Sequence, residues 1–175
     1  MQNGRPEAYI TGVGVVSPVG VGREDFWKAL LAGESGMAPI SLFDASAHDV
    51  RIAAECSDFE PKDFMDRKVV QRTDRFAQMG LAASKLALED ARVWDVLNAH
   101  PERVGLILGS GLGGVSSMED TQWTIDNKGP NRVNPFAVTK IMANAGAAHV
   151  GIQLGVQGPS STGALACSCG TDMMG

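Results

Sequence analysis

The sequence predicts an α/β fold, because short apolar segments that suit buried strands alternate along the chain with longer segments of helical periodicity. At 175 residues and 44% hydrophobic composition, the chain can bury one sizeable core. Its 21 glycines cluster around the apolar runs, which indicates tight turns and close backbone packing. No linker, repeat or low-complexity tract interrupts this pattern, so we expect one continuous unit.

The first half contains two predicted strands and two predicted helices. Residues 8–16 (AYITGVGVV) are apolar and β-branched, which predicts a buried strand. Residues 25–33 predict a helix, because bulky apolar side chains recur at i,i+4 spacing and a glycine follows. Residues 51–56 (RIAAEC) predict another strand. Residues 73–91 begin with a capping-type Thr or Asp and predict a helix with a small-residue face for close packing.

The second half continues the alternation. Residues 104–108 predict a buried strand that runs into the glycine-rich stretch GSGLGG at 109–114. Residues 129–136 (GPNRVNPF) predict a loop, and residues 137–150 predict a second small-residue helix.

Composition and charge exclude several classes of function. The net charge is −5, with 15 Lys and Arg against 20 Asp and Glu, which disfavours a broad nucleic-acid surface. No apolar run approaches the roughly 20 residues that cross a bilayer, and the start shows no secretory signal. Three cysteines without a CxxC pair disfavour a disulfide framework or a structural zinc site. We therefore expect a soluble protein of a reducing compartment, the cytoplasm.

The glycine-rich stretch 109–114 fits G-x-G-x-x-G after a strand, so a dinucleotide site must be weighed. That fingerprint requires an acidic residue about 20 positions further on, for the ribose. Position 134 is Asn, and the nearest acidic residues come too early: Glu119, Asp120 and Asp126. A tight glycine turn beside a pocket is the favoured interpretation, and a dinucleotide-binding oxidoreductase domain is an alternative.

Cys167 is the candidate nucleophile, because it ends a small-residue strand and begins a helix. Unpaired N–H groups and the positive end of the helix dipole favour a thiolate there. The alternative is a small buried hydrophobe, and from spacing alone both interpretations stay open. Cys169 completes a C-x-C pair, but on a helix the two side chains diverge, and a metal would need further ligands. The available histidines are His48, His100 and His149.

Two other groups of residues favour structural interpretations when taken alone. His149 is a candidate base, but a single histidine on a predicted helix is more often structural. A basic cluster is typical of a solvated helix start, and it contains Arg67, Lys68, Arg72 and Arg75.

Several blocks of sequence together resemble the β-ketoacyl-acyl-carrier-protein synthases, and the type II, elongating subgroup fits best. The blocks keep that family's order and approximate spacing over nearly the whole chain: AYITGVGVVSPVG (8–20), FWKALLAGESG (26–36), TDRFAQMGLAAS (73–84), LGSGLGG (108–114), NPFAV (134–138) and GPSSTGALACSCG (158–170). The resemblance implies a thiolase-like fold, in which two related halves form alternating α-β-α-β-α layers, usually as a homodimer. Residues 1–175 would be most of the N-terminal half, incomplete at its C-terminal end.

The family reaction is a decarboxylating Claisen condensation in fatty-acid or related polyketide synthesis. The resemblance implies that an acyl group moves from acyl carrier protein to Cys167, and that malonyl carrier protein then loses CO2 and attacks the thioester. The backbone N–H of Cys167 would form half of the oxyanion hole. A thiolate both attacks and leaves a thioester well, so no metal or redox cofactor is required.

Further roles follow from the same resemblance. Leu112 matches a residue that lines the acyl pocket beside the nucleophile. Phe136 and Ala137 match a loop that reaches the partner subunit's acyl pocket. Lys68 and Arg72 match the basic area on which the acidic carrier protein docks. His149 falls on a helix position that the family does not use as its base, so its structural interpretation stands.

This sequence also departs from the family pattern. Leu165 stands where Thr is usual, Cys169 where Ser, Ala or Thr is common, and Ala137 where an aromatic residue is frequent. We hypothesise that Ala137 admits longer or branched acyl chains. The family's catalytic histidines, its assisting lysine and the second oxyanion donor would lie beyond the cysteine, outside residues 1–175. We therefore expect residues 1–175 alone to expose apolar faces and an open sheet edge, and to be poorly stable.

A non-catalytic subunit resembling a chain-length factor, which shapes a partner's pocket, is the other alternative. Retention of Cys167 argues against it, because such subunits typically lose the nucleophile.

Overall fold

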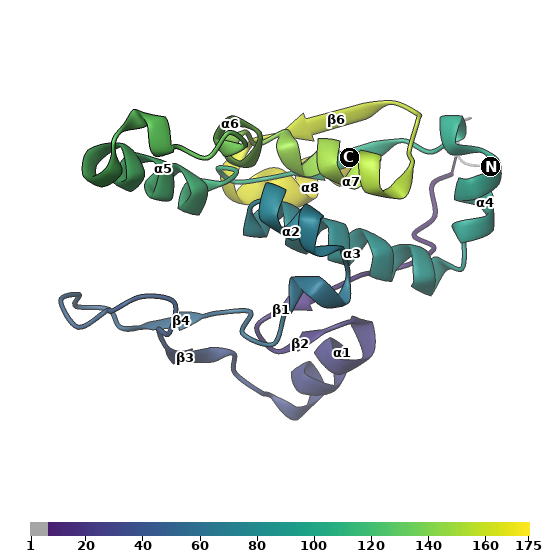
Figure 1. Ribbon diagram of the computed structural model, residues 1–175. Coiled ribbons are helices and arrows are strands. Elements are labelled where there is room, and N and C mark those ends of the chain that lie inside the picture. The colour runs from purple at the N-terminus through teal and green to yellow at the C-terminus, as the bar shows by residue number, and fades with distance from the viewer. Residues whose placement is uncertain (1–6) are drawn as a thin grey trace.

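The computed structural model describes residues 7–175 (Figure 1). Residues 1–6, which belong to the stretch in which we expect no secretory signal, lie outside the described residues. Its α-helices are α1 Arg23–Ala32, α2 Arg67–Arg72, α3 Arg75–Ala91, α4 Trp94–Ala99, α5 Val115–Lys128, α6 Ala137–Ile141, α7 Ala145–Leu154 and α8 Cys169–Met174. Short 3-10 helices are η1 Pro61–Asp63, η2 Pro101–Arg103, η3 Pro130–Arg132 and η4 Ala166–Ser168. The strands are β1 Val16–Ser17, β2 Gly20–Val21, β3 Met37–Pro39, β4 Ile52–Ala54, β5 Leu106–Gly109 and β6 Ser160–Gly163.

The strands pair two by two within residues 7–175. β1 pairs with β2 and β3 pairs with β4, both antiparallel. β5 and β6 are parallel, in a register that sets Gly109 opposite Gly163. Because a parallel pair needs a long crossover, the chain between them contains α5, α6 and α7. This crossover brings the start of the glycine-rich stretch beside the segment that leads to Cys167.

The core forms where α3 packs along α7, below the β5–β6 pair in the view of Figure 1. Met65, Leu81 and Val150 are its buried centre, and Leu106 and Leu108 of β5 pack against them. The predicted small-residue face of residues 73–91 (Gly80, Ala83 and Ala87) is confirmed as a close-packing face, although it is only partly buried: Gly80 lies against Leu108, and Ala83 and Ala87 lie against the backbone of Gly12 and Gly14. Small side chains let these neighbours approach α3 closely.

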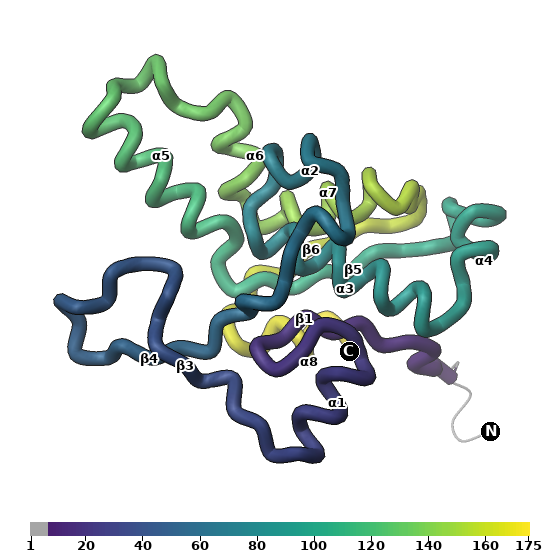
Figure 2. Tube along the Cα trace, turned by 60° about the horizontal axis from the view of Figure 1, so that its bottom comes forward, coloured from purple at the N-terminus to yellow at the C-terminus, as the bar shows by residue number. Residues whose placement is uncertain are grey.

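The prediction of a buried strand over residues 8–16 is wrong for most of its length. The backbone forms no ladder before Val16, and Tyr9 and Ile10 are 76% and 82% exposed. The segment instead runs beside α3 (Figure 2), where a Cβ added at Gly14 would overlap the carbonyl of Ala83. An apolar, β-branched composition favours an extended backbone, but a strand ladder also needs a partner strand. Within residues 7–175, the neighbour of this segment is the helix α3.

The predicted helix over 137–150 is divided into α6 and α7. The backbone is extended at Met142, with φ −60° and ψ 133°. The cause lies outside the segment: the carbonyl of Ile141, which would continue the helix, accepts the N–H of Gly114 at 3.0 Å. A glycine-rich loop distant in sequence therefore ends α6.

The other predicted elements are confirmed with shifted ends. α1 begins at Arg23 and ends at Ala32, and the next residue, Gly33, has φ 68°, the left-handed cap that glycine favours. The strand predicted over 51–56 is β4, and the one predicted over 104–108 is β5. The loop predicted over 129–136 contains η3.

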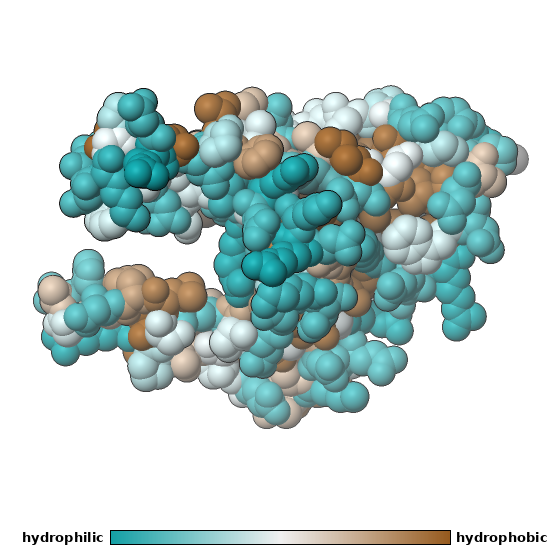
Figure 3. All heavy atoms as spheres, in the orientation of Figure 1, coloured by the Kyte–Doolittle hydropathy of each residue, from teal (hydrophilic) through white to brown (hydrophobic). Residues whose placement is uncertain are grey.

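The molecule exposes far more surface than a compact one of its size. Its accessible area is 12113 Å², whereas a compact monomer of this length exposes about 8200 Å². Figure 3 shows a notch between an arm formed by α5 and an arm formed by β3 and β4, with hydrophobic residues on the β3–β4 arm. Leu42 and Phe43 on that arm are exposed. Across residues 7–175, every helix is too short or too polar to cross a membrane.

Candidate functional site

Cys167 lies at the tip of a sharp turn between β6 and α8. The chain leaves β6 at Gly163, and η4 carries Cys167 before α8 begins at Cys169. Ala166 has φ 51°, in the left-handed region that residues other than glycine rarely adopt. Cys167 is exposed and its thiol is free. The strand-then-helix setting predicted for Cys167 is therefore confirmed, and its catalytic role stays a prediction.

Cys169 lies beneath this turn and ties it to the end of β5. Its side chain is buried, with 7% of the residue exposed. The Leu165 N–H donates to its Sγ at 3.0 Å, and its S–H donates to the Ser110 carbonyl at 3.0 Å. A Cβ added at Gly109 would lie 2.7 Å from the Cβ of Cys169, so only glycine fits there. Sequence analysis noted Cys169 as a departure from the family, but missed these bonds.

Three of the four glycines of residues 109–114 are packed against the protein itself, and Gly111 has open space around it. Gly113 has φ 81°, and a Cβ added there would lie 3.0 Å from the backbone of Ala143. A Cβ added at Gly114 would overlap the Lys140 carbonyl. The backbone at Gly113 and Gly114 therefore packs closely against the turn between α6 and α7, as the interpretation of this stretch as a tight glycine turn predicts. The loop presents Leu112, 78% exposed, toward solvent.

Asp74 joins the helices on either side of this loop. It is 8% exposed. Its carboxylate caps α3 by accepting the Phe76 N–H at 3.4 Å, and it accepts the N–H and the Oγ–H of Ser117 on α5 at 3.1 and 2.6 Å. The capping role was visible in the sequence, whereas the bond to α5 was not, because it joins residues 43 apart.

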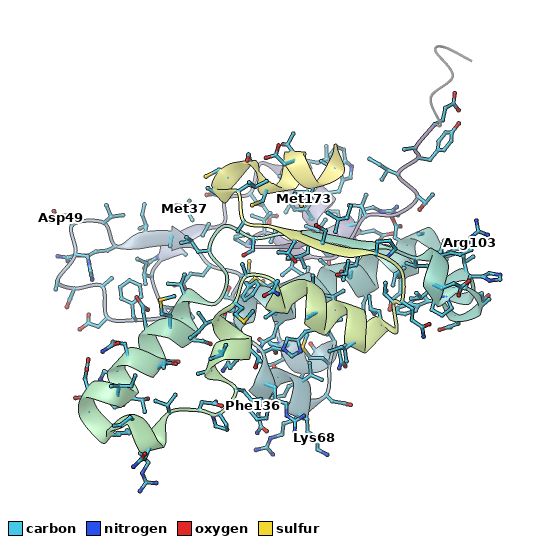
Figure 4. All side chains as sticks on the ribbon, turned by 90° about the horizontal axis from the view of Figure 1, so that it is seen from above. Met37, Asp49, Lys68, Arg103, Phe136 and Met173 are labelled. Carbon is cyan, nitrogen blue, oxygen red and sulfur yellow. The ribbon has the colours of Figure 1, made fainter. Side chains whose placement is uncertain are left out.

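Phe136 and Arg72, predicted for different roles, are in contact. The Arg72 guanidinium lies 4.9 Å from the centroid of the Phe136 ring. Figure 4 shows Phe136 and Lys68 at the same end of the molecule, well away from Met173 of α8. Within this chain, Phe136 is therefore separated from the end of α8 at which Met173 lies. Ala137 is buried at the start of α6.

The basic cluster divides into exposed and structural members. Lys68 and Arg72 are exposed on α2, as is Arg67. Arg75 is half-buried, donates to the Cys56 carbonyl at 2.6 Å and lies over the Phe59 ring. Arg75 is therefore a structural residue.

His149 is half-buried on α7, and removal from water lowers the pKa of its imidazole. Desolvation is the cause of the shift, so the pKa reflects packing. Groups of three or more side chains able to hold a metal are absent from residues 7–175.

A polar cavity of about 330 Å³ lies between α5, η3 and α6. Its charged lining, which sequence analysis did not single out, consists of Asp120, Lys128, Arg132 and Lys140. Ala137 also lines it, and Cys167 does not. The excess of cations makes this face of the molecule a basic surface within an acidic protein.

Curated proteins with similar sequences are condensing enzymes. The 3-oxoacyl-[acyl-carrier-protein] synthase 2 of Synechocystis sp. is 37% identical over 167 residues, which cover 95% of this chain and 40% of that protein. The enzymes of the same name from Coxiella burnetii and Staphylococcus aureus strain N315 are 37% and 34% identical, with the same shares covered. The chain thus spans about 40% of the length of the curated relatives it matches.

Solved structures with the same fold are ketosynthases. The ishigamide ketosynthase/chain length factor matches with a TM-score of 0.79 at 27% identity, over 88% of this chain and 38% of that chain. A beta-ketoacyl synthase from Burkholderia phymatum STM815 matches with a TM-score of 0.77 at 22% identity, over 94% of this chain and 41% of that chain. The predicted α/β, thiolase-like fold is confirmed by these structures.

Residues 7–174 match the family model "Beta-ketoacyl synthase, N-terminal domain". This assignment leaves the dinucleotide-binding alternative without support. The chain belongs to the beta-ketoacyl synthase family.

Proposed function

We propose that this chain carries the acyl-accepting nucleophile of an elongating β-ketoacyl-acyl-carrier-protein synthase, a condensing acyltransferase of fatty-acid or related polyketide synthesis. The observation that carries the proposal is the exposed Cys167 thiol at a sharp strand-to-helix turn. Relatives named 3-oxoacyl-[acyl-carrier-protein] synthase 2 support the reaction class. Cys167 is the only cysteine of the chain classed as exposed, which suits attack on an incoming thioester.

In the first step the Cys167 sulfur attacks the acyl thioester carbonyl. The bond to the carrier thiol breaks, the carrier leaves as a free thiol, and the acyl group remains on Cys167. The Cys167 N–H would be one of two donors to the developing oxyanion, and loss of one such donor typically costs about 3–4 kcal/mol of transition-state stabilisation. Sulfur suits both directions of transfer, so the step needs no metal or redox cofactor.

In the second step malonyl carrier protein loses CO2, and the carbanion that remains attacks the Cys167 thioester. A carbon–carbon bond forms, the 3-oxoacyl product stays on the carrier, and Cys167 leaves as a thiolate that takes up a proton. The resemblance assigns the proton-handling histidines to residues outside 1–175. The contribution of this chain is therefore the nucleophile and one oxyanion donor.

The carrier protein is proposed to dock on the exposed cations of α2, Lys68 and Arg72. Arg132 and Lys140 extend the basic surface along the polar cavity and would oppose an acidic carrier helix. One structural neighbour, 21% identical to this chain with a TM-score of 0.75, is a type II PKS acyl-carrier protein in complex with its ketosynthase. The match covers 95% of this chain and 44% of the neighbour's chain.

We also propose a homodimer, supported by the large exposed area. Leu112 would line the acyl pocket beside Cys167, and Phe136 with Ala137 would reach the pocket of the other subunit. A nucleophilic thiol must stay reduced, and the cysteines of residues 7–175 are free, which suits the cytoplasm.

A chain-length-factor-like subunit is the second candidate, because a ketosynthase/chain length factor is among the matching structures. Cys167 argues against it, since a subunit that only shapes a pocket needs no exposed thiol at this turn.

The test is a mass measurement of the whole protein after incubation with acyl carrier protein that carries an acyl group as its thioester. We expect one acyl group on Cys167, lost in Cys167→Ala and retained in the control Cys56→Ala. Acylation that persists in Cys167→Ala would assign the acyl group elsewhere and reject the proposal. Carrier binding without any acylation of the wild-type protein would favour the non-catalytic subunit.

A further inference from the structure

We propose that Cys169 is a positioning residue for Cys167, and that its buried thiol holds the turn that presents the nucleophile. The inference rests on the proposed function, since it assigns Cys169 a part in acyl transfer. Cys169 itself does not touch the substrate, because it lies beneath the turn with 7% of its surface exposed.

The thiol of Cys169 joins the turn that carries Cys167 to the end of β5. Among the side-chain hydrogen bonds described for residues 7–175, only those of Cys169 connect these two segments directly. The thiol accepts the Leu165 N–H at 3.0 Å, two residues before Cys167, and donates to the Ser110 carbonyl at 3.0 Å, at the end of β5. A backbone bond from the Ser110 N–H to the Gly163 carbonyl at 2.9 Å lies beside it. Cys169 thus fixes the far end of the turn, and the β5–β6 pairing fixes the near end.

The turn needs such a restraint because its backbone is strained. Ala166 has φ 51°, and a non-glycine residue keeps this conformation only where its surroundings impose it. The bond to Sγ fixes the Ala164–Leu165 peptide, which lies one residue before the strained Ala166. A second bond, from Ser168 Oγ to the Leu165 carbonyl at 2.9 Å, is on the surface and stays within the turn.

Both bonds require the thiol in its neutral form. The S–H donates to the Ser110 carbonyl at 3.0 Å, with the Gly163 carbonyl as a more distant acceptor at 3.8 Å, and the sulfur accepts the Leu165 N–H. A serine hydroxyl has the same capacity to donate and accept. Alanine has neither, and would leave the Leu165 N–H and the Ser110 carbonyl without these partners. The turn would then relax toward an ordinary backbone conformation and carry both the Cys167 sulfur and its N–H away from the thioester.

The experiment compares Cys169→Ala and Cys169→Ser in the intact protein, with Cys56→Ala as a matched control. Cys56 is a partly buried thiol, whereas Cys169 is buried, and the sulfur of Cys56 forms no hydrogen bond within residues 7–175. Two rates are measured at Cys167 by peptide mapping: acylation by acyl carrier protein, and alkylation by iodoacetamide. The second rate reports the turn without any carrier or condensation step.

We expect Cys169→Ala to slow acylation at saturating carrier protein about tenfold, with the carrier KM within about twofold of wild type. Alkylation of Cys167 should slow about threefold, because the sulfur no longer stays at the tip of the turn. Cys169→Ser should restore both rates to within about twofold, and Cys56→Ala should leave both unchanged. A merely structural defect in Cys169→Ala would lower the melting temperature, but it would not slow acylation at saturating carrier protein while leaving the carrier KM unchanged.

Wild-type rates in Cys169→Ala, or a Cys169→Ser variant as slow as Cys169→Ala, would overturn the inference. If Cys169→Ala does not fold, deuterium exchange of the Leu165 amide in the wild-type protein decides: slow exchange supports the bond, and fast exchange overturns it. If wild type is not acylated at all, the proposed function fails. The alkylation rates of the Ala and Ser variants still test the positioning role in that case.

Discussion

Replacement of Asp74 by alanine should loosen α3 and α5 together, because one buried carboxylate caps both helices. The weak cap bond to Phe76, at 3.4 Å, is worth about 0.5 kcal/mol, the low end for N-caps. The two bonds from Ser117, at 3.1 and 2.6 Å, contribute about 2–3 kcal/mol, since they end on a charged, mostly buried group. We therefore expect Asp74→Ala to lower the free energy of unfolding by about 3 kcal/mol.

Urea unfolding of the intact protein measures this loss as a shift of the midpoint at constant m. Asp74→Asn is the matched control, because one amide oxygen can still accept from Ser117, and about half of the loss should remain. In a double-mutant cycle with Ser117→Ala, the two residues should couple by about 1–2 kcal/mol. A loss below about 0.5 kcal/mol in Asp74→Ala, or strictly additive effects, would refute the double cap.

Three further outcomes are expected. Gly109→Ala should lower the free energy of unfolding by about 1–3 kcal/mol, because the added methyl group overpacks against Cys169. The control Gly111→Ala should lower it by about 0.5 kcal/mol or less, because the space around Gly111 is open. Equal melting temperatures of the two variants would contradict this prediction. Arg72→Ala should raise the carrier-protein KM about fivefold and weaken its salt dependence, and the exposed Arg103→Ala should do neither; equal effects would argue against docking on α2. Ala137→Phe should shift acyl-chain preference toward shorter chains, and an unchanged product profile would reject a pocket role for Ala137.

Local pattern was sufficient where an element depends on its own residues. α1 ends at Ala32 because Gly33 takes the left-handed cap, and α3 begins at the capping Asp74. The setting of Cys167, between a small-residue strand and a helix, was predictable for the same reason. These features depend on neighbours within one or two turns of chain.

Prediction failed where distant residues decide the structure. α6 ends because Gly114 takes the Ile141 carbonyl, and residues 8–15 run along α3 because a ladder partner is absent from residues 7–175. The Cys169 bond to Ser110 and the contact of Arg72 with Phe136 likewise join segments far apart in the chain. A single sequence carries no local pattern for such pairings, so the candidate nucleophile was found and its supports were not.

The bond between Cys169 and Ser110 spans 59 residues, and this separation orders the assembly of the site. Closing so long a loop has an entropic cost, which is offset only when β5 pairs with β6 and the crossover helices pack. Within residues 7–175, the segment that carries Cys167 is also synthesised after the segments that contact it. Full presentation of Cys167 is therefore a late event in folding, and its alkylation rate can serve as a probe of completed β5–β6 pairing during refolding.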